Sequence, residues 1–414
     1  MPSGEQLAHD AAQRVARASY GRLVAFLAKR TRDVAQAEDA LAEAFVAALQ
    51  DWPVTGIPQN PDAWLIAVAK RKHIDGTRKH KSRADAADHL LLLAEELEDM
   101  AKSAPAIPDE RLALMFACAH PALDPGIRSP LILQTILGLN AEQIAAAFLV
   151  PPATMGQRLS RAKAKIRVAG IPFRVPEREA LGERLETVLE AIYACYAQGW
   201  NEADHLNNAL TEEALWLGRL VVELLPGEPE CLGLLALMLF LQSRRKARRF
   251  DGGFVPLLEQ DITLWDLDDI NAAESLLRRA GAMGQIGRYQ LEAAIQSVHA
   301  ARRASGITDW QALCLLYQAL YQLTESAVVK LNWAAAIAEK DGVAAGLAAL
   351  PNATAFPELE PYQPYHAVRA DLLARSGKID EALAAYARAM ALEHDPAIRN
   401  FLSKQAEKLR HTLN

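Results

Sequence analysis

The pattern of apolar and polar positions predicts helices along nearly the whole chain. Apolar residues recur at helical spacing among Ala, Leu, Glu, Arg and Lys, and no stretch alternates β-branched and polar residues as a half-buried strand would. Near the N-terminus, Leu23, Phe26 and Leu27 define the apolar face of one helix, and the positions from Ala37 to Ala48 define that of the next. We therefore expect an all-α fold.

Residues 140–167 contain two of these helices, joined by a turn marked with prolines. Asn140 and Gln143 can form a capping box, and Pro151 and Pro152 separate the helices because proline is tolerated only in a first helical turn. The apolar side chains of the second helix share one face. They are Met155, Leu159, Ala162 and Ile166. The opposite face and its flanks are polar or basic and are expected to be solvated; they consist of Thr154, Gln157, Arg158, Arg161, Lys163, Lys165 and Arg167.

This segment has the sequence form of a helix-turn-helix whose second helix enters the major groove of DNA. Arg and Gln side chains can contact base edges there, and Lys side chains can contact phosphates. The alternative is an ordinary surface helix, on which Lys and Arg need no ligand. The absence of acidic residues from Thr154 to Arg167 favours DNA binding, because solvated helices usually mix charges at i,i+4.

A second basic helix follows the loop expected at residues 51–61. Trp64 and Val68 belong to its apolar face, and it continues into residues 70–83, which contain seven Lys or Arg and one acidic residue. Most basic stretches are simply solvated, but a basic helix that is held in place by a buried face is a better candidate for binding nucleic acid. Residues 84–109 are acidic and rich in Ala, and we expect them to form a linker.

The formal net charge of -6 hides an uneven distribution along the 414 residues. Residues 1–176 contain 22 Lys and Arg against 19 Asp and Glu, whereas residues 177–414 contain 23 against 32. A nucleic acid would therefore meet a local field that the total charge does not reveal. Four scattered cysteines fit a reducing cytoplasm, and no apolar stretch approaches the roughly 18 residues that a membrane-spanning helix needs.

No residue pattern indicates an active site. Cys118 and His120 lack the second pair of ligands that a zinc site needs, so we expect a buried thiol and a locally hydrogen-bonded imidazole. The glycines at 281–287 follow a helical pattern rather than a strand, which favours a turn between helices over a phosphate-binding loop. We expect no catalytic residue, no metal and no cofactor, and hence no enzyme.

Two helical units, each with a basic helix, resemble the minimal bacterial sigma factors of the extracytoplasmic-function type. The stretch "DVAQAEDALAEAFVAALQDWP" resembles their polymerase-docking helix, "NPDAWLIAVAKRKHIDGTRKHKSR" the helix that melts and contacts the promoter -10 element, and "LNAEQIAAAFLVPPATMGQRLSRAKAKIR" the domain that contacts the -35 element. The resemblance implies polymerase contacts near Asp39, Glu43 and Phe45, although Ala42 stands where a glutamine is common. It also implies -10 contacts by Lys70, Arg71, Lys72, Arg78 and Lys79. Trp52 and Asn60 are candidates for capturing exposed bases.

The remaining residues resemble the extension of one sigma factor subgroup, which is similar to tetratricopeptide repeats. In the last repeat, small and aromatic residues occupy the positions that a close helix pair requires, namely Ala370, Gly377, Ala382, Tyr386 and Ala389. Ile262 and the stretch 197–203 depart from the subgroup's sequence. Arrays of this kind usually bind a peptide or another protein on their concave face.

These observations predict a sigma factor that binds core RNA polymerase and promoter DNA and directs transcription initiation under the control of its extension. The expected organisation is a region 2-like domain at 1–83, a linker at 84–109, a region 4-like domain at 110–172 and the extension at 177–414. A protein or peptide ligand of the extension is a further expected partner. Two alternatives stay open: a stand-alone helix-turn-helix regulator, and a helical-repeat scaffold for protein interactions.

Overall fold

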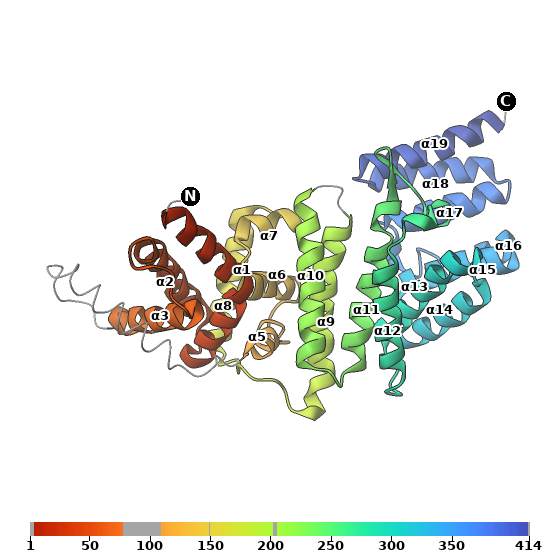
Figure 1. Cartoon of the computed structure of the whole chain (residues 1–414). Coiled ribbons are helices and arrows are strands. Elements are labelled where there is room, and N and C mark those ends of the chain that lie inside the picture. Colours follow the sequence, from red (N-terminus) through yellow and green to blue (C-terminus); the bar gives the residue numbers. More distant parts are fainter. Residues whose placement is uncertain (1–3, 78–108, 149, 202–204, 413–414) are drawn as a thin grey trace. The chain divides into compact units, whose positions relative to one another are not determined.

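The computed structural model describes residues 4–77, 109–148, 150–201 and 205–412, which are almost entirely helical (Figure 1). The prediction of an all-α fold with a C-terminal helical array is confirmed. Two compact units divide the chain, the first reaching to Ala214 and the second beginning at Leu215. The expected linker at 84–109 lies outside the described residues except for Asp109.

The first unit is built on a long N-terminal helix that packs against α2, α3, α5 and α6. Its helices are α1 (Gly4–Thr31), α2 (Val34–Thr55), α3 (Pro61–Thr77), α5 (Arg111–Cys118), α6 (Pro125–Leu137), α7 (Ala141–Ala147), α8 (Pro152–Val168) and α9 (Arg178–Asn201), followed by the start of α10 (His205–Leu224). Asp33 caps α2, because its carboxylate accepts a hydrogen bond from the Gln36 amide at 3.2 Å.

The end of α2 differs from the loop that the prolines at 51–61 predict. The helix continues to Thr55 and includes Pro53, so the connection to α3 is limited to Gly56–Asn60. The buried side chain of Trp52 explains this extension, since its ring packs edge-on against Trp64 of α3 with centroids 5.6 Å apart. This aromatic contact stabilises a last helical turn that the sequence pattern assigns to a loop.

Close approach between α1 and α6 joins the two predicted sigma domains within the first unit. A Cβ atom at Gly21 would overlap the backbone carbonyl of Ile136, so no larger residue fits there without movement. Helix α9 packs against α5 and α6, and the Arg184 guanidinium donates a hydrogen bond to the Phe116 carbonyl at 2.7 Å. The first compact unit therefore includes a helix that the sequence assigns to the extension.

The second unit is a succession of helices around a strongly apolar helix, α11. Its elements after α10 are α11 (Pro229–Ser243), η1 (Arg245–Arg248), β1 (Arg249–Phe250), β2 (Gly253–Phe254), η2 (Leu257–Glu259), η3 (Ile262–Leu264), α12 (Leu267–Gly281), α13 (Arg288–Ser305), α14 (Trp310–Thr324), α15 (Ala327–Asp341), α16 (Val343–Ala349), η4 (Pro357–Leu359), α17 (Gln363–Arg375), α18 (Ile379–Leu392) and α19 (Pro396–Thr412). Between α12 and α13, Gly284 has a φ of 71°, so the predicted turn between helices is confirmed.

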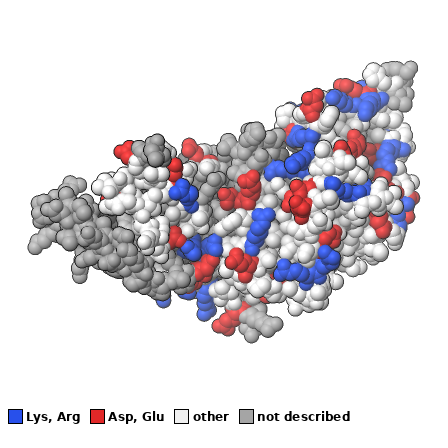
Figure 2. Space-filling model, in the orientation of Figure 1, with Lys and Arg blue, Asp and Glu red and all other residues white. Residues whose placement is uncertain are grey.

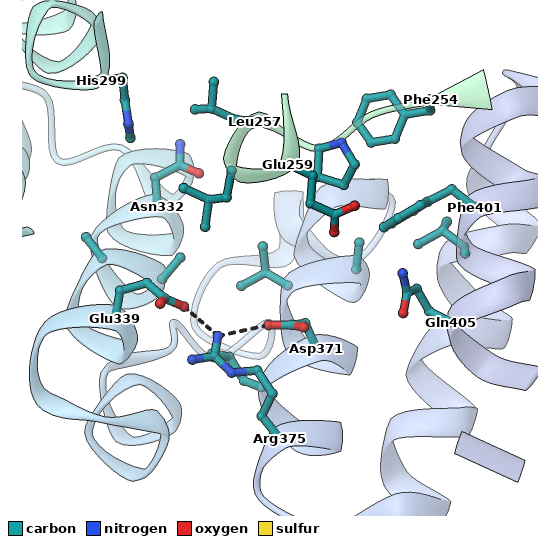
Figure 3. Close-up of a pocket in the computed structure, with 18 of the residues that line it drawn as sticks. Phe254, Leu257, Glu259, His299, Asn332, Glu339, Asp371, Arg375, Phe401 and Gln405 are labelled. Carbon is teal, nitrogen blue, oxygen red and sulfur yellow. Dashed lines mark hydrogen bonds and ion pairs between the residues drawn. The ribbon is translucent and has the colours of Figure 1, made fainter. Parts of the chain in front are cut away.

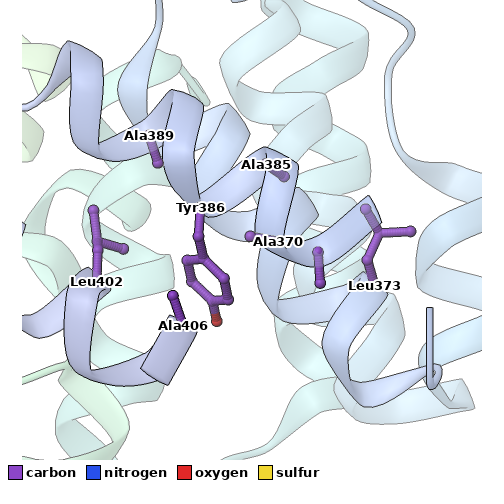
Figure 4. Close-up of a cluster of buried hydrophobic side chains, with 8 residues drawn as sticks. Ala370, Leu373, Ala385, Tyr386, Ala389, Leu402 and Ala406 are labelled. Atoms are coloured by element: carbon purple, nitrogen blue, oxygen red, sulfur yellow. The ribbon is translucent and has the colours of Figure 1, made fainter. Parts of the chain in front are cut away.

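The expected last repeat forms the helix pair α17 and α18 (Figure 4). Ala370, Ala382 and Ala389 are fully buried, and Tyr386 lies beside Ala406 of α19 in the same cluster. The pattern assigns Gly377 to the crossing of the two helices. In the structure it lies in the turn between them instead, with a φ of 79°.

In the view of Figure 2, acidic and basic side chains are interspersed over the described surface.

Candidate nucleic-acid interface

Helices α7 and α8 form a helix, turn and helix with the local interactions that the sequence predicts. The Asn140 side chain accepts a hydrogen bond from the Gln143 amide at 2.9 Å, and the Gln143 side chain accepts one from the Asn140 amide at 3.0 Å. This reciprocal pair is a capping box. The expected core face of α8 is confirmed, since Met155, Leu159, Ala162 and Ile166 are all buried.

The other side of α8 presents polar and basic groups to solvent. Thr154, Gln157, Arg161 and Lys165 are exposed, as the pattern predicts. Arg158 is half-buried, and its guanidinium lies 3.6 Å from the Asp124 carboxylate at the start of α6. Arg158, Arg161 and Lys165 line one side of a hollow of about 290 Å³ whose other side comes from residues 123–127. These side chains form a basic surface that a nucleic acid could contact.

Two basic residues of α8 pair with acidic residues from the region of α2; Lys163 is largely buried there, contrary to the pattern, whereas Arg167 is exposed, as the pattern predicts. The Lys163 ammonium lies 2.6 Å from Glu38 of α2, and only 11% and 12% of the two side chains are exposed. The Arg167 guanidinium lies 3.1 Å from the carboxylate of Asp33, the residue that caps α2. We call this docking of α8 on α2 the closed arrangement. The acidic partners that are absent from α8 itself therefore come from a helix more than a hundred residues away.

Glu38 is largely removed from water in this contact, and the loss of solvation disfavours its charged form. Burial raises the pKa of Glu38, against the opposing effect of Lys163. One of its two carboxylate oxygens has no hydrogen-bond partner within the described residues. Tyr20 lies nearby, and burial together with the charges of Glu38 and Asp39 raises its pKa. The Glu38–Lys163 pair is thus a buried contact rather than a surface ion pair.

The residues that the resemblance assigns to polymerase docking follow one another along α2. Asp39 and Glu43 are exposed, whereas Phe45 is half-buried. Asp39 directly follows Glu38, so the expected docking surface borders the contact with α8. The first unit therefore places an exposed acidic surface and the closed arrangement on the same helix.

The basic helix α3 is described only at its beginning. Lys70 is exposed with its ammonium 5.4 Å from the centre of the Phe26 ring, and Arg71 is half-buried. Lys72 lies on α3, but its side chain lies outside the described residues, as do Arg78 and Lys79 entirely. The structure thus describes the side chains of two of the five residues expected to contact the -10 element, and all five contacts stay predictions.

The two candidates for capturing bases have structural roles here. Trp52 is 2% exposed and packs on Trp64, so its ring cannot stack on a base in this arrangement. The Asn60 side chain accepts a hydrogen bond from the Ala63 amide at 3.1 Å and thereby caps α3. Trp52 was a poor candidate because a ring at the end of an apolar helix face is more often core than exposed.

Cys118 and His120 have the local environments that the sequence predicts. Cys118 is fully buried, with its sulfur 3.5 Å from the Thr135 hydroxyl, and burial raises the pKa of this thiol to about 12. The His120 Nδ1 accepts a hydrogen bond from the Ala122 amide at 3.1 Å. In the part of the chain that the structure describes, no group of three ligating side chains could hold a metal ion.

Residues 15–83 match the model of sigma-70 region 2, and this match covers the second half of α1 and all of α2 and α3. The N-terminal part of the chain therefore carries a region similar to sigma-70 region 2. The chain is 31% identical over 161 residues to the probable RNA polymerase sigma factor RfaY of Xanthomonas campestris pv. campestris, which covers 36% of this chain and 40% of that protein. The more extensive similarity is to the uncharacterized protein R00370 of Rhizobium meliloti, at 39% identity over 388 residues and 91% of each chain.

A different family matches further along the chain. Residues 184–281 match a family of unknown function (DUF6596), which extends from α9 to the end of α12. No solved structure is significantly similar to the chain. Among the described residues, no helix is long and apolar enough to cross a membrane.

Proposed function

We propose that this chain is a sigma factor that binds core RNA polymerase and directs it to specific promoters for transcription initiation. The observation that supports this most directly is the region 2 match over a compact three-helix unit with an exposed acidic surface at Asp39 and Glu43. The exposed basic surface of α8 supports a second DNA contact. The chain itself would make or break no covalent bond.

The finer assignment follows the two basic helices. We assign the -10 element to α3 and residues 70–83, and the -35 element to α8 through Arg158, Arg161 and Lys165, with Thr154 and Gln157 at its N-terminal end. Arg and Gln can form bidentate contacts with guanine and adenine, respectively, whereas Lys mainly neutralises phosphate charge. Region 2-like and region 4-like domains at 1–83 and 110–172 would then act on one promoter together.

The closed arrangement is incompatible with simultaneous binding of both elements. The two elements are named for positions about 25 base pairs apart, which at about 3.4 Å per base pair corresponds to about 85 Å of DNA. In the closed arrangement the Lys163 ammonium lies 2.6 Å from Glu38, on a helix that packs directly against α3. We infer that α8 leaves α2 when polymerase and promoter bind.

The proposal has three finer parts. The chain belongs to the extracytoplasmic-function subgroup, its second unit is similar to tetratricopeptide repeats, and this unit controls the activity. Stacked helix pairs such as α15 with α16 and α17 with α18 support a repeat-like array. The close crossing of the first pair depends on Gly346, where a Cβ atom would overlap Ala338. We place the protein in the cytoplasm, where the core polymerase would be its partner.

The decisive experiment is run-off transcription with purified core polymerase on genomic DNA fragments, with and without the full chain. We expect discrete transcripts that depend on the chain, from promoters that share two sequence elements. The matched control is a chain in which Arg158 and Arg161 are replaced by Ala, which should give fewer transcripts at equal concentration. Transcripts that are identical with and without the chain would refute the proposal.

Binding to core polymerase separates the two alternatives from the proposal. A stand-alone helix-turn-helix regulator would bind DNA but would not need the region 2-like unit, and would not bind the core enzyme. An interaction scaffold would show no salt-dependent DNA binding at all. Co-elution with core polymerase and the slope of DNA affinity against salt concentration distinguish the three.

A further inference from the structure

A cavity of about 510 Å³ lies inside the second unit (Figure 3). It is bounded by residues 254–259 and by side chains from α13 to α15 and from α17 to α19. This volume is within the range of roughly 300 to 1,000 Å³ that is typical of small-molecule sites. Its walls are largely apolar and aromatic, and include Phe254, Trp310, Tyr317, Val368, Tyr386 and Phe401.

The charged groups around the cavity are predominantly acidic. The Arg375 guanidinium lies 2.5 Å from Glu339 and 3.2 Å from Asp371. Burial alone would lower the pKa of Arg375, but its hydrogen bonds to these two carboxylates outweigh this effect and raise it. Glu259 adds a third carboxylate (Figure 3). Three carboxylates and one guanidinium leave a formal charge of -2 at the cavity.

His299 does not offset this negative charge. Burial, together with the nearby Arg244 and Arg302, lowers its pKa to about 3, so the imidazole is neutral at physiological pH. Among the described lining residues, Arg375 is then the remaining cation, and two carboxylates already bind it. An anionic ligand would meet repulsion without an available cationic partner.

Arg302 of α13 holds the backbone next to Glu259 by hydrogen bonds. The Arg302 guanidinium, only 9% exposed as a residue, donates hydrogen bonds to the carbonyls of Leu257 at 2.9 Å and Leu258 at 3.3 Å, directly before Glu259. It also lies 5.2 Å from the centre of the Trp265 ring. The Glu259 side chain itself has no hydrogen bond or ion pair within the described residues. The short helix η2, which Arg302 holds by these hydrogen bonds, therefore presents an uncompensated carboxylate to the cavity.

We propose that this cavity binds a small organic amine with an apolar or aromatic body. The ammonium group would pair with Glu259 and face the aromatic rings, because a cation is attracted both to carboxylates and to the π faces of Phe, Tyr and Trp. The apolar body would fill the space between α15, α17 and α19. The side-chain amides of Asn332 and Gln405 also border the cavity and offer further hydrogen bonds (Figure 3).

Calorimetric titration of the full chain with three related probes tests the charge preference. Tryptamine has the required ammonium and aromatic body, N-acetyltryptamine lacks the charge, and indole-3-acetate reverses it. We expect tryptamine to bind at least about tenfold more tightly than either analogue, a difference of about 1.4 kcal/mol. Equal binding of the neutral analogue, tighter binding of the anion, or no binding of tryptamine at millimolar concentration would overturn the proposal.

Two substitutions locate the binding site without disturbing the fold. Glu259→Gln should weaken tryptamine binding about fivefold or more, because the ammonium then meets a neutral amide oxygen instead of a carboxylate and the ion pair is lost. Glu358→Gln removes another exposed carboxylate of the same unit that does not line the cavity, and should leave binding unchanged. Equal affinities of the two variants would overturn the assignment.

Titration with a peptide tests whether the amine belongs to a small molecule or to a lysine side chain of another protein. The tripeptide acetyl-Trp-Lys-Trp-amide presents the same cation on a lysine side chain. Binding of this peptide without any binding of tryptamine would assign the cavity to a basic protein segment and overturn the small-molecule assignment. Neither arm measures transcription, so the outcome is independent of the proposed sigma factor activity.

Discussion

Replacing Glu38 by Gln tests whether the closed arrangement restrains DNA binding. The substitution keeps the size of the side chain but removes the charge that Lys163 of α8 faces at 2.6 Å. In the proposed function, α8 contacts the -35 element only after it leaves α2. Weakening the contact should therefore increase the fraction of chains that can bind DNA.

We expect the free energy that the Glu38–Lys163 pair contributes to the closed arrangement to lie between the values for an exposed and a buried ion pair. Exposed ion pairs contribute about 0.2–1 kcal/mol, whereas breaking a fully buried pair costs about 3–5 kcal/mol. The two side chains are 11% and 12% exposed, but one oxygen of Glu38 is buried without a partner, which offsets part of the attraction. We expect the closed arrangement to lose about 1 kcal/mol, and a chain that is mostly closed would then bind DNA about fivefold more tightly.

Fluorescence anisotropy of a labelled promoter duplex, at one fixed salt concentration, measures this change. Removing any negative charge near DNA also raises affinity, so the matched control is Glu142→Gln on α7. Glu142 is exposed beside α8, and α7 does not form part of the closed arrangement. We expect Glu38→Gln to raise the affinity clearly more than this control does.

Two outcomes would refute the reasoning. Equal increases in both variants would mean that charge, and not opening of the closed arrangement, causes the effect. Unchanged affinity for Glu38→Gln would mean that the contact with α2 does not limit DNA binding. A double-mutant cycle of Glu38→Gln and Lys163→Gln in urea unfolding measures the coupling separately, and should give more than the corresponding cycle for Asp33 and Arg167, whose arginine side chain is 59% exposed.

Three further predictions concern the DNA contacts and the second unit. Arg158→Ala and Arg161→Ala should each cost about 1–3 kcal/mol of promoter affinity if the contact to guanine is bidentate, and unchanged affinity in the double variant would refute that contact. Replacing Lys70, Arg71 and Lys72 by Gln should impair promoter melting, measured by permanganate footprinting, more than it impairs polymerase binding. A chain that ends after α9 should still bind DNA but fail to activate a reporter at matched protein levels; equal or higher activity would instead indicate inhibition by the second unit.

Local interactions in this chain could be predicted from sequence because they depend on neighbouring residues. The capping box of Asn140 and Gln143 and the buried face of α8 follow from spacings of three and four residues. The turn at Gly284 between α12 and α13 has the same local origin. The all-α fold class is the sum of many such local preferences.

Contacts between distant segments could not be predicted in this way. Nothing in the sequence near Lys163 indicates that Glu38 would lie beside it, because the pairing depends on how α8 packs against α2. The longer α2 has a similar cause, since the contact between Trp52 and Trp64 crosses a loop. The cavity of the second unit combines residues from 254 to 405 and has no local sequence signature.

In the closed arrangement, α2 and not the extension is the element that covers basic residues of α8. Residues 177–414 contain 23 Lys and Arg against 32 Asp and Glu, a composition with which the extension could cover the basic surface of α8. Within the first unit, however, Glu38 of α2 already pairs with Lys163, and Asp33, the N-cap of α2, pairs with Arg167. Arg161 and Lys165 are exposed on α8 and have no ion pair within the described residues, and both belong to the set that we assign to the -35 element. Restraint of DNA binding by α2 therefore requires no contact from the extension, and opening by polymerase would be sufficient to release α8.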